Sequence, residues 1–202
     1  MYSPDLKRVL EDPNLFIAQL IEVYEVYRDA LLNRKYYAQR MTFHKTVNQY
    51  YEIILAMGTS STIAAWAFWK TGLGELAWTL IGGLVAVLVI LKPIFQLSKE
   101  IERFTKLYIG WKNLHYDLKE LVTGIKSQET LTAEMLKQFS AAKERKRQVQ
   151  EDEDPRPLKR LVRKYTDEVN EEIPLENLWR PKSSTEKIVG HSILVVKEGK
   201  HV

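Results

Sequence analysis

Residues 53–95 read IILAMGTSSTIAAWAFWKTGLGELAWTLIGGLVAVLVILKPIF, and no other part of the chain is apolar over such a length. Two apolar arms, 53–69 and 76–95, flank KTGLGE, whose two glycines and two charges suit a short polar turn. A helix that spans a bilayer needs roughly 20 mostly apolar residues, with a range of about 17 to 25. The sequence therefore predicts a hairpin of two transmembrane helices over residues 53–96, in contact with membrane lipid.

Aromatic residues mark both ends of this predicted hairpin, as they do at the two interfaces of a bilayer. Three tryptophans lie near the turn, and Tyr50, Tyr51 and Phe95 lie at the opposite end. The alternative is that the arms are core helices of a soluble bundle, which a mean hydropathy of −0.28 leaves open. Lysines and arginines flank the outer ends of both arms, whereas the turn carries only Lys70. Since such flanks stay on the cytoplasmic side, both termini are predicted to be cytoplasmic.

The length, charge and residue composition of the chain argue against an enzyme. It has 202 residues, a net charge of +4 and no cysteine, so disulfides, cysteine-bound zinc and thiol catalysis are excluded. Its four histidines lie far apart in the sequence, and no glycine-rich phosphate loop is present. We therefore predict no catalytic residues, no metal and no cofactor. Attraction to anionic lipid is a simpler explanation of the mild positive charge than binding to nucleic acid. No direct nucleic-acid partner is therefore expected.

Long helices are predicted on both sides of the hairpin. Asp12 and Pro13 suit the start of a helix, and the chain then has neither proline nor glycine as far as Tyr51. After the hairpin, apolar or aromatic residues and one histidine alternate steps of three and four, which is the pattern of a coiled-coil seam. The members of this seam are Ile101, Phe104, Tyr108, Trp111, His115, Leu118, Val122 and Ile125. We expect the second helix to fold back along the first as a stalk, with a second row of leucines leaving a face free for homo-oligomerisation.

The sequence thus predicts an all-α fold: a two-helix transmembrane hairpin continued by long cytosolic helices that form a coiled-coil-like stalk. Thr130 or Thr132 can cap a further helix, a charged linker follows at 151–157, and a short helix at 158–172 ends before Pro174. The tail at 188–196 has strand composition and is either a disordered end or a docking segment. The predicted parts are an N-terminal helix at 1–52, the hairpin at 53–96, coiled-coil-like helices at 97–150, and the linker, short helix and tail at 151–202.

Small and hydroxyl-bearing residues inside the hairpin form the candidate site. Small residues let helices approach closely, and hydroxyls can hydrogen-bond across helices. One interpretation is that these residues only pack the two arms together. The other is that the hydroxyls form a polar seam, which lines a water-filled path when several hairpins assemble. The residues concerned are Gly58, Thr59, Ser60, Ser61, Thr62, Gly82 and Gly83.

The order of these parts, with arms at 53–69 and 76–95 and a heptad pattern at 101–125, resembles the SLATT-type two-transmembrane effectors of bacterial antiphage systems. The resemblance rests on layout and covers about residues 14 to 170. It implies a multi-pass protein of the bacterial inner membrane that works beside a nucleotide-signal synthase or a reverse transcriptase encoded nearby. It also implies that the protein permeabilises or depolarises that membrane during abortive infection. Residues 158–202 are too few and too charged for a nucleotide-binding domain, so control by a partner protein is expected.

Two other functions remain open from the sequence. The first is a membrane anchor or scaffold subunit that recruits a cytosolic partner through its stalk or through the tail at 188–196. The second is a membrane-bound enzyme, for which no catalytic set can be assembled from the residues. Our leading hypothesis is the effector that oligomerises and permeabilises the membrane.

Overall fold

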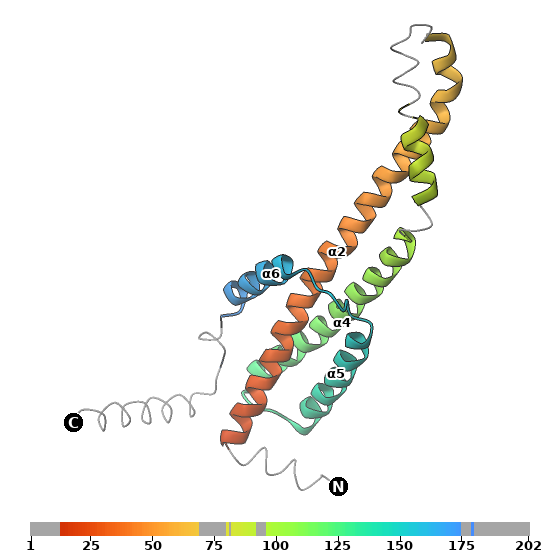
Figure 1. Ribbon diagram of the computed structural model, residues 1–202. Coiled ribbons are helices and arrows are strands. Elements are labelled where there is room, and N and C mark those ends of the chain that lie inside the picture. Colours follow the sequence, from red (N-terminus) through yellow and green to blue (C-terminus); the bar gives the residue numbers. More distant parts are fainter. Residues whose placement is uncertain (1–12, 69–79, 81, 92–95, 175–178, 180–202) are drawn as a thin grey trace, which may run out of the picture. The chain divides into compact units, whose positions relative to one another are not determined.

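The computed structural model describes residues 13–68, 80, 82–91, 96–174 and 179, and within these ranges all regular structure is helical. The predicted all-α class is therefore confirmed. A further helical run covers residues 82–91 (Figure 1). The main helices are α2 (Pro13–Phe68), α4 (Leu97–Gln128), α5 (Ala133–Glu151) and α6 (Lys159–Glu172).

Helix α2 begins at Pro13 and continues without a break into the first apolar arm, as the sequence predicted. Proline suits a first helical position because its fixed φ fits the helix and its missing N–H would have had no partner there. The chain divides into two compact units. Unit 1 consists of residues 1–36 and 109–202, and unit 2 of residues 37–108, so α2 and α4 each contribute to both units.

Unit 1 is a bundle of the first part of α2, the second part of α4, α5 and α6. Its core contains Trp111, which is fully buried, together with leucines and other apolar side chains from all four helices. Burying each large apolar side chain contributes about 1.5–3 kcal/mol relative to leaving it exposed. The buried residues of α2 and α4 in this unit are Leu20, Val23, Tyr24, Val26, Ala30, Leu31, Tyr36, Trp111, Leu114, His115, Leu118, Leu121, Val122 and Ile125.

Helix α5 packs on α4 at close range. Thr132 caps its N-terminus, since the hydroxyl accepts a hydrogen bond from the Met135 N–H at 3.2 Å. At the other end of α5, Val149 lies so near Gly110 of α4 that an added Cβ there would be 2.9 Å from Val149 Cγ2. Glycine at position 110 therefore permits this approach of α4 and α5.

Helix α6 buries Tyr165 and Val169, and polar contacts join it to α2. At the start of α6, the Leu158 N–H donates a hydrogen bond of 3.1 Å to the Tyr36 hydroxyl. This bond gives a partner to one of the first N–H groups, which have none within a helix. The helix ends at Glu172, just before Pro174, as predicted.

Unit 2 pairs the second part of α2 with the helical run 82–91 and the start of α4. Tyr37 stacks near Phe104 at a ring-centroid distance of 6.2 Å, whereas Tyr51, further along α2, donates a hydrogen bond to the Leu88 carbonyl. The partner position falls as the α2 position rises, so the paired segments are antiparallel. The predicted turn at 70–75 lies outside the described residues, and the predicted transmembrane hairpin is not confirmed.

The predicted location in a membrane is wrong. Among the residues that the structure describes, no helix is long and apolar enough to cross a bilayer. The apolar part of α2 follows a polar stretch that contains Arg40, Lys45 and Glu52, and the helix stops at Phe68. A multi-pass inner-membrane protein with cytoplasmic termini is therefore not supported.

Candidate functional site

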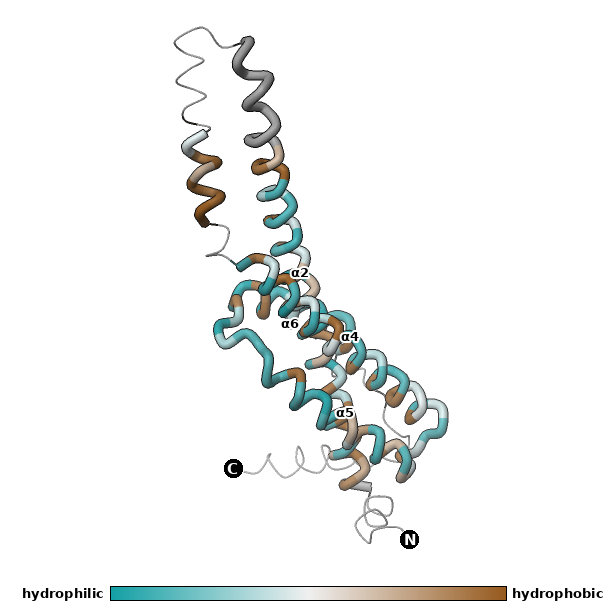
Figure 2. The backbone as a smooth tube through the Cα atoms, turned by 90° about the vertical axis from the view of Figure 1, so that its right-hand side faces the viewer, coloured by the Kyte–Doolittle hydropathy of each residue, from teal (hydrophilic) through white to brown (hydrophobic). Residues whose placement is uncertain are grey.

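The most unusual surface of the molecule is apolar and belongs to unit 2. The run 82–91 begins with two glycines, is hydrophobic over the rest of its length (Figure 2) and contains no charged residue. Large exposed apolar surfaces on a protein mark places where it interacts with something else. We define the apolar surface by seven aliphatic side chains of unit 2 that are 42–67% exposed. They are Ile53, Ile54, Leu80, Leu84, Val87, Val89 and Ile90.

The face of the run 82–91 that meets α2 differs from its exposed face. Leu88 and Val85 are partly buried, and the Leu88 carbonyl accepts the hydrogen bond from Tyr51. Leu80, Leu84 and Val87 follow one another at steps of four and three, which places them together on the exposed side. Only one side of this helix is therefore used within unit 2.

Gly82 and Gly83, which were predicted to help pack the two arms together, have free space where a side chain would be. A Cβ added at Gly82 or Gly83 would meet no atom within 4 Å, so no described part of the chain lies against either residue. The other members of the predicted seam lie in the helical part of α2, but their side chains are outside what the structure describes. The polar path through Thr59, Ser60, Ser61 and Thr62 therefore stays a prediction.

The heptad seam predicted to mediate oligomerisation is mostly buried inside the chain. Within unit 2, Phe104 is 1% exposed, and within unit 1 the side chains from Trp111 onward pack against their own neighbours. A role in contacts between copies is not tested by this burial and stays a prediction. The buried members are Phe104, Trp111, His115, Leu118, Val122 and Ile125, whereas Ile101 and Tyr108 are half-buried.

His115 is the one buried polar residue among the described core side chains. Its ring stacks on Tyr27 of α2, with centroids 4.9 Å apart and an angle of 11° between the planes. Burial above all, and then the positive charges of Arg34 and Lys119, lower the pKa of His115 to about 4, although the Glu172 carboxylate acts in the opposite direction. The imidazole is therefore neutral at physiological pH, and its Nδ1 has no hydrogen-bond partner. Sequence reasoning placed this histidine in a helical interface, where the structure also finds it.

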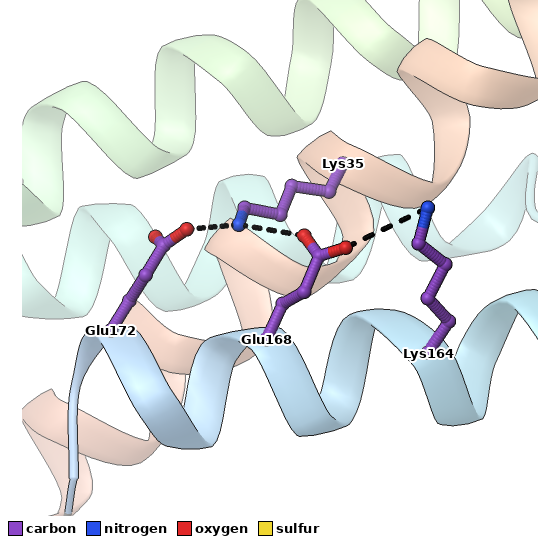
Figure 3. A network of polar contacts seen from close by, with 4 residues as sticks. All are labelled: Lys35, Lys164, Glu168 and Glu172. Atoms are coloured by element: carbon purple, nitrogen blue, oxygen red, sulfur yellow. Dashed lines mark hydrogen bonds and ion pairs between the residues drawn. The ribbon is translucent and has the colours of Figure 1, made fainter.

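A polar network holds α6 to α2 (Figure 3). Lys35 bridges two carboxylates one turn apart on α6, with Nζ 3.1 Å from Glu168 and in contact with Glu172. Burial lowers the pKa of Lys35, but the hydrogen bonds and charges of the two glutamates outweigh this and raise it overall. Lys164 adds a looser pair of 3.7 Å with Glu168. The network joins the C-terminal turn of α6 to α2.

A half-buried acid, Glu153, follows the end of α5. One carboxylate oxygen of Glu153 is fully buried. Burial raises the pKa of Glu153, Asp29 raises it further, and Lys146 and the indole of Trp111 lower it. Among the described residues no group of three or more potential ligands could hold a metal ion.

Comparison of the chain with protein-family models, with curated proteins and with solved structures gives no match. Nothing among these comparisons identifies a SLATT-type family. The resemblance and the function that it implies therefore stay predictions.

Proposed function

We propose that this chain is a helical assembly protein that associates with copies of itself through the apolar surface of unit 2 and so arrays unit 1. The observation that supports the proposal is the exposure of seven aliphatic side chains in one small unit. Exposure of such side chains to water costs free energy, and packing against the same surface of a second copy removes them from water. A symmetric contact also needs no partner other than this chain.

The free energy available from this surface can be compared with the cost of association. Complete burial of a leucine, isoleucine or valine side chain is worth about 1.5–3 kcal/mol. Because the seven side chains are 42–67% exposed, each has about 1 kcal/mol left to gain. Two copies together would gain about 14 kcal/mol, against an association cost of about 4–15 kcal/mol. The difference ranges from about zero to about 10 kcal/mol, and the upper part of this range corresponds to micromolar or tighter association.

The open glycines favour a second helix as the occupant. Gly82 and Gly83 expose backbone on the run 82–91 with free space where a Cβ would be. Small residues let two helices approach until their backbones are in contact, which increases dispersion attraction. An apolar helix with this pattern in a second copy is complementary in shape and in polarity.

Cross-linking through a single introduced cysteine tests this proposal, because the natural chain contains none. The variant Gly82→Cys should tolerate the side chain, since nothing lies within 4 Å of the new Cβ. We expect a short bismaleimide to give covalent dimers of this variant at low micromolar concentration. The matched control is Ser140→Cys, at an exposed position of α5 in unit 1. Equal dimer yields for both variants, or none for Gly82→Cys, would contradict the proposal.

The scaffold function left open by the sequence is compatible with this proposal. An assembled protein can present many copies of unit 1 to one partner, which raises the effective concentration of the binding surface. A role in antiphage defence and control by a protein encoded nearby remain predictions from the resemblance. The absence of enzymatic activity, which was predicted from the residues, also remains a prediction.

A further inference from the structure

Unit 1 contains a groove that none of the functions above uses. Its volume is about 400 Å³, and it lies where α2 and α4 meet the C-terminal end of α6. Tyr24 and Tyr27 line it from α2, Val122 and two lysines from α4, and Glu172 at the end of α6. The volume falls in the range of about 300–1,000 Å³ that is typical of small-molecule sites.

The charge of the groove is positive. Lys119 and Lys126 stand two helical turns apart on the same side of α4, and neither forms an ion pair with the described residues. The single carboxylate of the groove, Glu172, is already bound by Lys35 (Figure 3). Arg34 adds its positive charge next to Tyr27. The groove thus has cations without counter-ions, which favours an anionic ligand.

The wall of the groove is aromatic and rigid. Tyr27 is held from behind by its stack on His115, and Tyr24 is 3% exposed. Burial raises the pKa of both tyrosines, so their hydroxyls stay neutral and can donate hydrogen bonds. The Tyr24 hydroxyl is buried next to the backbone of Trp179, so this side chain supports the wall of the groove from within the core.

We propose that this groove binds a small aromatic anion, with its flat ring against Tyr24, Tyr27 and Val122 and its acidic group at Lys119 and Lys126. Phosphate, sulfonate and carboxylate groups all fit the two ammonium groups, since lysine acts on each as a point charge. The aromatic faces and the apolar valine account for the ring. The site lies within unit 1, so it is independent of the apolar surface of unit 2.

Isothermal titration of the full chain with naphthalene-2-sulfonate tests the proposal, with the uncharged naphthalene-2-sulfonamide as the matched probe. We expect the sulfonate to bind at least about tenfold more tightly than the sulfonamide, because two partly exposed charges contribute on that scale. The double variant Lys119→Glu/Lys126→Glu should lose this advantage while it keeps its affinity for the sulfonamide. Retained sulfonamide binding shows that the groove is intact in the variant.

The charge-matched control is Lys137→Glu/Lys159→Glu, which changes two exposed lysines of unit 1 outside the groove. Its affinity for the sulfonate should stay within about twofold of that of the natural chain, since distant exposed charges are screened. Equal affinity of the natural chain for both probes would overturn the proposal. So would undiminished sulfonate binding by the groove variant. Failure of self-association would leave this result unaffected, because that test concerns unit 2.

Discussion

The buried His115 makes the stability of unit 1 depend on pH in a way that can be calculated. The pKa of His115 is about 4 in the folded chain, compared with an ordinary value of 6.5. In the unfolded chain the imidazole takes up a proton as the pH falls below 6.5, whereas in the folded chain it stays neutral down to about 4. Proton uptake by the unfolded state alone favours unfolding. Stability is therefore highest above pH 6.5 and is lost between pH 6.5 and pH 4.

The size of this loss follows from the two pKa values. One pKa unit corresponds to about 1.4 kcal/mol, so the fall from 6.5 to about 4 amounts to about 3 kcal/mol. The side chain is only 4% exposed, so solvent does little to screen the effect. Arg34 from α2, Lys119 from α4 and Glu172 from α6 are the charged groups that act on the imidazole. The two cations disfavour protonation of the imidazole, whereas the Glu172 carboxylate favours it.

The variant His115→Phe isolates this contribution, since phenylalanine keeps a ring against Tyr27 and cannot titrate. We would measure the free energy of unfolding in urea for both proteins from pH 7.5 to pH 4. The difference between the natural chain and the variant should shift by about 3 kcal/mol toward the variant over this range. Glu153 acts in the opposite direction, because its raised pKa makes the folded state more stable as the pH falls. We would therefore repeat the comparison with Glu153→Gln added both to the natural chain and to His115→Phe, so that titration of Glu153 is removed from both. A difference that stays constant with pH would refute the reasoning.

Three further substitutions test local features of unit 1 through the free energy of unfolding. Lys35→Ala should cost about 1 kcal/mol and less in high salt, and a double-mutant cycle with Glu168→Ala should show coupling, since the lysine side chain is 17% exposed. Gly110→Ala should destabilise because its Cβ would lie 2.9 Å from Val149 Cγ2, and Val149→Ala should make the same change favourable by about 1 kcal/mol. Glu129→Gly should stabilise by about 1 kcal/mol, because residue 129 follows α4 with a φ of +52°. Unchanged stability in any of the three would contradict the contact concerned.

The ends of the helices could be predicted from the sequence because they depend on local chemistry. Pro13 starts α2, Thr132 caps α5, and Pro174 follows the end of α6, as expected. The alternation of threes and fours also placed Trp111 and His115 in a buried interface. Each of these signals lies within a few residues of the feature that it predicts.

The partners of these faces could not be predicted, because a periodic apolar pattern does not say what covers it. The heptad seam proved to be buried within the chain, where the sequence suggested contacts between copies as well. The apolar length of residues 53–95 predicted two membrane spans, but no described helix is both long and apolar enough to cross a bilayer. The groove beside Tyr24 and the bridge from Lys35 to α6 join residues more than 100 positions apart, and no short motif connects them.

Sedimentation equilibrium of the full chain tests the central claim, self-association through unit 2, most directly. We expect the natural chain to show a concentration-dependent equilibrium between a monomer and a discrete oligomer in the micromolar range. The triple variant Leu84→Glu/Val87→Glu/Ile90→Glu should be monomeric, whereas Ile109→Glu/Leu158→Glu, at exposed apolar positions of unit 1, should associate like the natural chain. A natural chain that is monomeric throughout, or a triple variant that associates equally well, would contradict the account.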